Sequence, residues 1–136
     1  MTIPVPDFTN PMLDRVAQGD MSILEEWYDF TLIERQDYQD WNALIVAAFK
    51  GHFNLVNRLL EIEAVRAYAA EMDSWALRQA AENRHSEVVH ALAKIKWPLG
   101  KQDMPEGMQQ YLPIIMAGAQ LYTAKREQER ILMSAL

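Results

Sequence analysis

The sequence contains no cysteine. A disulfide framework, thiolate chemistry and a metal site with thiol ligands are therefore excluded. A chain without cysteine is compatible with a reducing compartment, and we expect the protein to be cytoplasmic.

Glycine and proline are also scarce, with 5 Gly and 6 Pro in 136 residues, whereas 50% of the residues are hydrophobic. This composition argues against a chain that is disordered over most of its length, because it supplies enough apolar side chains for a core. We expect a single compact domain over residues 1–136.

Basic residues are in the minority, since 13 Lys and Arg face 19 Asp and Glu and give a formal charge of -6. Nucleic acids and anionic membranes favour a basic face, so we expect neither as a partner. No stretch approaches the roughly 18 apolar residues of a membrane span. The first residues, MTIPVPDFTNP, lack the basic segment of a cleaved signal. These features favour a soluble chain whose partner is another protein.

Motifs that carry catalysis are also missing. The sequence has no G-x-S-x-G, no P-loop and no dinucleotide-binding fingerprint. His85 and His90 lie five positions apart, which separates them by roughly 140° around a helix and does not suit a shared metal ion. Glu127 and Glu129 are better explained as part of a solvated helix face than as an acid–base pair. We expect no enzyme activity, no cofactor and no metal site.

The middle of the chain contains an internal repeat. Residues Asp40 to Leu59 (DWNALIVAAFKGHFNLVNRL) align without gaps on Asp73 to Leu92 (DSWALRQAAENRHSEVVHAL), at an offset of about 33 residues. Average residue usage would give roughly one identity over such a window. The identical pairs are Asp40/Asp73, Ala43/Ala76, Leu44/Leu77, Ala47/Ala80, Ala48/Ala81, His52/His85, Val56/Val89 and Leu59/Leu92.

Each repeat is predicted to form two short antiparallel helices. Asp40 and Asp73 can cap the first helix of each unit by accepting bonds from free backbone N–H groups. A turn at residues 50–52 then precedes a second apolar stripe, and neither helix can bury its stripe alone. The predicted core positions are Leu44, Ala47, Ala48, Leu55, Val56, Leu59 and Leu60 in the first unit, and Leu77, Ala80, Ala81, Val88, Val89 and Leu92 in the second.

The run AAFKGHFNLVNRLL from Ala47 resembles the ankyrin repeat, in which an alanine pair, Gly-His and two apolar pairs fall in the same register. The fold class implied is all-α, with stacked antiparallel helix pairs forming an ankyrin-like solenoid of about three degenerate repeats. The resemblance covers an N-terminal repeat over 1–36, a first full repeat over 37–69, a second over 70–102 and C-terminal capping helices over 103–136. Short ankyrin-like proteins of intracellular bacterial pathogens look similar, which would place a secreted effector of this type in the host cytoplasm.

Two features depart from the family pattern. Arg84 replaces the turn glycine of the second full repeat and would be strained in a left-handed turn. The segment EIEAVRAYAAEMD replaces the projecting hairpin of the family, and its Ala, Glu and Arg content favours a helix.

The C-terminal region is predicted to close the stack. Trp97 covers the end of the last repeat, and the neighbouring lysines remain in solvent rather than on phosphate. Met108 to Tyr122 has helical spacing, and Pro113 should kink or split that helix.

The resemblance also implies a binding face, because ankyrin proteins hold partners with residues before the first helix and before the turn glycine. The corresponding partner-binding residues are Tyr38, Gln39, Trp41, Phe49, Lys50, Glu71, Met72, Ser74, Glu82 and Asn83. Exposed Tyr, Trp and Phe would serve as interface anchors, although Tyr38 and Trp41 could equally fold inward and fill the core.

The function predicted is a protein–protein interaction module that binds a protein partner, in its sharper form as an inhibitor or regulator of an enzyme. The alternative is a self-associating helical structural protein, in which the apolar tail Ile131-Leu132-Met133 pairs two copies as a homodimer.

Overall fold

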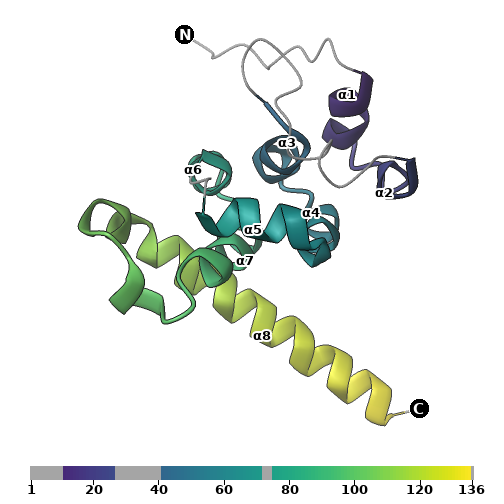
Figure 1. The fold of residues 1–136 in the computed structure, drawn as a ribbon. Helices are drawn as coiled ribbons and strands as arrows, with labels where there is room; N and C mark the ends of the chain where they lie inside the picture. Colours follow the sequence, from purple (N-terminus) through teal and green to yellow (C-terminus); the bar gives the residue numbers. More distant parts are fainter. Residues whose placement is uncertain (1–10, 27–40, 72–74, 136) are drawn as a thin grey trace, which may run out of the picture.

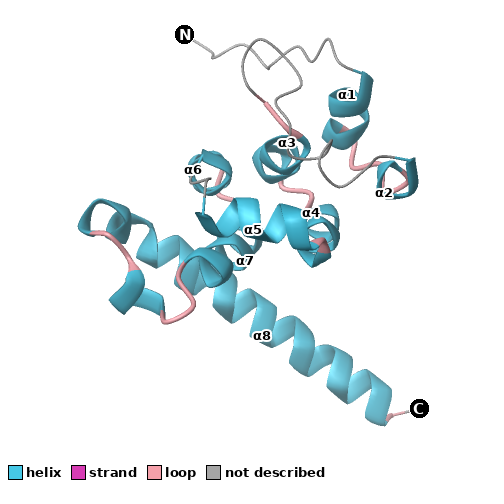
Figure 2. Ribbon diagram, viewed as in Figure 1, coloured by secondary structure: helices cyan, strands magenta, loops and turns pink. Residues whose placement is uncertain are grey.

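The computed structural model describes residues 11–26, 41–71 and 75–135, which contain helices and turns and no strand (Figure 2). The prediction of an all-α chain is confirmed for these residues. None of the helices described combines the length and the apolar character needed to cross a membrane. The helices are α1 (Pro11–Ala17), α2 (Ile23–Glu26), α3 (Ala43–Lys50), α4 (Phe53–Glu61), α5 (Glu63–Glu71), α6 (Trp75–Glu82), α7 (Ser86–Lys96), the 3₁₀ helices η1 (Gly100–Asp103) and η2 (Glu106–Tyr111), and α8 (Leu112–Ser134).

The helices pack in successive layers. α3 lies between α1 and α6, and α4 packs against both α5 and α7 (Figure 1). The predicted core positions are buried, apart from the partly buried Ala81. The two helical stripes that the repeat predicts therefore meet in one apolar core.

The first full helix of the repeat begins later than predicted. Its N-cap is Asn42, whose side-chain oxygen accepts a 2.9 Å bond from the backbone N–H of Ile45. Asp40 and Asp73, the predicted caps, lie outside the described residues. A buried asparagine at this position satisfies a backbone donor that the apolar surroundings would otherwise leave unpaired.

Two successive turns, after α1 and after α3, are each held by a histidine from the next turn along the chain. Gly51 ends α3 in the left-handed conformation, with φ 74°, and His85 donates from Nε2 to the carbonyl oxygen of Phe49 over 3.0 Å. His52 bonds in the same way to the carbonyl of Ala17 at 2.7 Å. These bonds join neighbouring turns.

The departures from the family pattern have clear structural counterparts. Arg84 has φ 59°, the strained left-handed turn that the sequence predicted. The segment after α4 forms the helix α5. Pro113 lies in the first turn of α8, directly after the 3₁₀ helix η2, so the predicted C-terminal helix is split there. Trp97 is buried, as expected.

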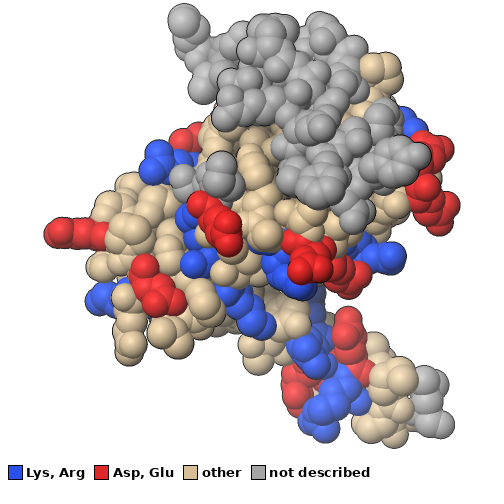
Figure 3. Space-filling model, in the orientation of Figure 1, with Lys and Arg blue, Asp and Glu red and all other residues tan. Residues whose placement is uncertain are grey.

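The last helix, α8, packs against α7 and then continues beyond the body of the protein (Figure 1). The contact is close because Gly118 faces the backbone of Ser86, where a Cβ atom would approach the carbonyl oxygen to 1.9 Å. From Thr123 to Ala135 the described side chains are exposed. In Figure 3 this end projects as a separate arm that carries both charge signs.

Candidate partner-binding surfaces

The residues predicted to bind a partner occupy different environments. Tyr38, Gln39, Met72 and Ser74 lie outside the described residues. Glu71 is exposed at the end of α5, and Glu82 and Asn83 are exposed at the end of α6.

Trp41 belongs to the core, with 6% of its surface exposed. Its ring lies 5.3 Å from the ring of Phe49 in an edge-to-face contact and 5.0 Å from the ring of Trp75. Of the two alternatives left open for Trp41, this geometry favours the inward one. Trp41 supports the two aromatic side chains beside it and has too little exposed surface to anchor a partner directly.

Phe49 is half-buried, and both its side chain and its backbone carbonyl make contacts that fix its position. Its ring rests against Trp41, its carbonyl oxygen accepts the bond from His85, and the Nζ atom of Lys50 lies 5.6 Å from the ring centroid. The bond from His85 also brings the turn containing Glu82 and Asn83 next to Phe49. We call Phe49, Lys50, Trp75, Glu82 and Asn83 the Phe49 surface.

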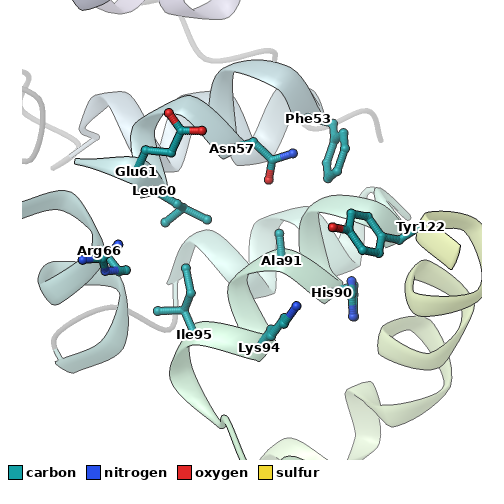
Figure 4. A pocket seen from close by; sticks show the side chains of 10 residues that line it. All are labelled: Phe53, Asn57, Leu60, Glu61, Arg66, His90, Ala91, Lys94, Ile95 and Tyr122. Carbon is teal, nitrogen blue, oxygen red and sulfur yellow. The ribbon is translucent and has the colours of Figure 1, made fainter. Parts of the chain in front are cut away.

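A second hollow lies between α4 and α7, closed at one end by α8 (Figure 4). Its volume is about 340 Å³. Phe53, Asn57 and Glu61 project from α4, whereas Arg66 comes from α5 and Tyr122 from α8. Leu60, His90, Ala91, Lys94 and Ile95 complete the lining.

The electrostatics of this hollow centre on α7. Burial and the nearby ammonium of Lys94 lower the pKa of His90, so its imidazole is neutral at pH 7. The His90 and Tyr122 rings lie 5.7 Å apart, and Lys94 Nζ lies 5.8 Å from the Tyr122 ring centroid. No cluster of three His, Asp or Glu side chains within the described ranges is arranged to hold a metal ion.

Sequence reasoning did not identify this hollow. Phe53 and Asn57 occupy the solvent side of α4 in the repeat pattern, where no binding position was assigned. Tyr122 was assigned only to a C-terminal capping helix, whose packing position was not predicted. The sequence does place aromatic and basic side chains on helices that are predicted to pack together. Whether these side chains come into contact depends on where α8 packs, which the sequence does not show.

Comparison with models of known families, with curated proteins and with solved structures finds no match to this chain.

Proposed function

We propose that this chain is a protein-binding module, in which the Phe49 surface docks a partner protein. The observation that carries the proposal is that Phe49 and Trp75 are only partly buried, although the ring of each packs against the buried indole of Trp41. Rigid aromatic side chains bury a large area at a low cost in conformational entropy.

The surroundings of this pair have the composition of an interface rim. Lys50 lies beside Phe49, and Glu82 and Asn83 are exposed on the adjacent turn. An apolar centre surrounded by polar side chains is the usual arrangement at specific protein interfaces. If the partner is an enzyme and docking covers its active site, binding would block the enzyme's activity. An inhibitor is therefore the more specific form of the proposal.

The ankyrin-like assignment belongs to the same proposal. Its support is the pair of bonds from His52 and His85, which connect turns at matching positions of successive units. An ankyrin-like stack would present its binding face on the side of the first helices, where the Phe49 surface lies.

The test is recovery of partners from a lysate with the wild-type chain and with Phe49→Ala. The control is Leu99→Ala, which removes an apolar side chain that is 70% exposed and lies outside the surface. We expect the set of captured proteins to be reduced by Phe49→Ala alone, with helix content by circular dichroism unchanged. Equal recovery by all three chains would contradict the proposal.

Trp41→Ala separates support from contact at the same surface. Because Trp41 is buried, its truncation should lower the free energy of unfolding by about 3–5 kcal/mol. A smaller effect on stability together with complete loss of the partner would instead assign Trp41 to the interface.

A second candidate function is self-association through the end of α8. Ile131, Leu132 and Met133 are 54%, 67% and 71% exposed on the projecting arm. Apolar side chains gathered at one end of a helix can contact a second copy, but burying so few of them only about offsets the cost of association, so this function ranks below the first.

A further inference from the structure

The hollow between α4 and α7 continues along α8. A neighbouring hollow of about 440 Å³ is lined by the outer half of α8 and shares Phe53, Asn57 and Tyr122 with the first. Together the two form a trough, here the α4–α8 trough, which runs from Arg66 on α5 to Met133 near the end of α8. From Tyr122 to Met133 alone, the rise of the helix gives a length of ~16 Å.

The trough is basic although the chain as a whole is acidic. Arg66, Lys94 and Arg126 line it, and none of them forms an ion pair with a carboxylate of the described residues. The other two cations already have partners, since Lys125 binds Glu87 at 2.7 Å and Arg130 binds Glu127. The trough therefore has cationic side chains available for an anionic ligand.

Its floor is apolar and aromatic. Phe53 and Tyr122 lie where the two hollows join, and Leu60 and Ile95 extend the apolar surface toward Arg66. Two of the three available cations sit against this floor, because Lys94 Nζ and the Arg126 guanidinium lie 5.8 and 5.7 Å from the Tyr122 ring centroid. A ligand that fits must present apolar groups and negative charge side by side.

We infer that the α4–α8 trough binds an acidic amphipathic segment of a partner protein. Apolar side chains of the segment pack on Phe53, Tyr122 and Ile95, while its carboxylates pair with Arg66, Lys94 and Arg126. A nucleic acid fits less well, because Glu61 and Glu129 also line the trough and would repel a continuous row of phosphates. This inference rests on the proposed protein-binding function and adds a second surface to it.

The experiment measures binding of a defined probe by fluorescence anisotropy. The probe is a fluorescein-labelled helical peptide of about 15 residues with leucines on one face and glutamates beside them. Its comparison peptide carries lysine in place of each glutamate, and oligothymidylate serves as a polyanion without apolar side chains. We expect saturable binding of the glutamate peptide alone, weakened by added salt.

Two charge reversals locate the site. Lys94→Glu combined with Arg66→Glu should weaken binding about tenfold or more, because two favourable pairs become repulsive. Lys101→Glu makes the same charge change as Lys94→Glu alone, but on η1 outside the trough, and should leave the affinity unchanged. Both lysines and Arg66 are exposed, so circular dichroism should show folded chains throughout.

Amide resonances show where the peptide lies. Shifts at Asn57, Ala91 and Ile95 are expected, whereas shifts confined to Phe49 and Glu82 would place the peptide on the Phe49 surface and overturn the inference. It is also overturned if the glutamate peptide does not bind, if the lysine peptide binds equally, if oligothymidylate binds instead, or if the charge reversals have no effect. The lysate experiment with Phe49→Ala fails or succeeds independently of these results.

Discussion

At the scale of single residues, the turns of the repeat depend on a glycine and a histidine that come from successive units. The His85 ring lies directly over Gly51, and a Cβ atom at that glycine would approach the ring to 2.4 Å. The His52 ring covers Gly19 in the same way at 3.0 Å. Glycine is therefore needed both for the left-handed backbone and for the space that the next imidazole occupies.

Gly51→Ala tests this double requirement. We expect the free energy of unfolding to fall by about 3 kcal/mol, because the left-handed backbone costs about 1–2 kcal/mol and crowding of the His85 ring adds to it. The matched control is Gly100→Ala, since Gly100 has φ 75° but no neighbour within 4 Å. Urea unfolding of both variants separates the two costs. Equal losses would mean that the imidazole moves aside freely.

His90 gives the stability of the fold a dependence on pH. Its pKa is lowered by burial and then by Lys94, so the unfolded chain takes up a proton at a higher pH than the folded chain. Stability should therefore fall as the pH drops below 6.5, the ordinary value, and the loss should be complete below the folded pKa. Urea unfolding between pH 5 and pH 8 should show this slope reduced in His90→Gln. Parallel profiles for the two chains would contradict it.

At the scale of elements, the sequence predicted those helices whose signals are local. The alanine-rich stretch after α4 forms α5, and Pro113 interrupts the C-terminal helix, because helix propensity and the missing N–H of proline act within a few residues. The sequence predicted Asp40 as the N-cap of α3, whereas the N-cap is Asn42. Asp and Asn both cap helices well, so the choice between them depends on the packing around the start of the helix.

The position at which α8 packs against α7 could not be predicted, because it depends on a contact between segments far apart in the sequence. Gly118 lets the helix approach the backbone of Ser86, yet glycine inside a helix normally indicates only a weak point. The Lys125–Glu87 ion pair then lies further along the same contact. Neither partner is suggested by the spacing of the apolar residues.

Gly118→Ala tests how closely α8 packs against α7. Alanine raises helix propensity by about 1 kcal/mol, but its Cβ would collide with the Ser86 carbonyl, which can yield only if the helices separate. We expect a net loss of about 1–3 kcal/mol in thermal or urea unfolding. Gly107→Ala is the control, because no atom lies within 4 Å of its added Cβ. A stabilised Gly118→Ala chain would show that the helices are not in close contact.

At the scale of the whole molecule, the two candidate sites differ in how many of their residues could be predicted from the sequence. The family resemblance singled out Phe49, Lys50, Glu82 and Asn83 together, because they precede the turn at matching positions of the two full repeats. Trp41 was assigned from the position before the first helix, and it lies inward against the rings of Phe49 and Trp75. The α4–α8 trough was not predicted, since residues of α4, α7 and α8 line it together only after α8 has packed against α7.

The projecting arm of α8 decides whether the molecule pairs with itself. Burying Ile131, Leu132 and Met133 of two copies stabilises a dimer by at most about 6–12 kcal/mol, counting ~1–2 kcal/mol for each partly exposed side chain. Association costs about 4–15 kcal/mol, so the two contributions nearly cancel. We therefore expect light scattering at micromolar concentration to show a monomer, both for the full chain and for a chain ending at Thr123. The shorter chain should remain folded, because it loses only residues whose side chains are exposed or lie outside the described ranges. A dimer that is present in the full chain and lost on truncation would instead establish self-association through this arm.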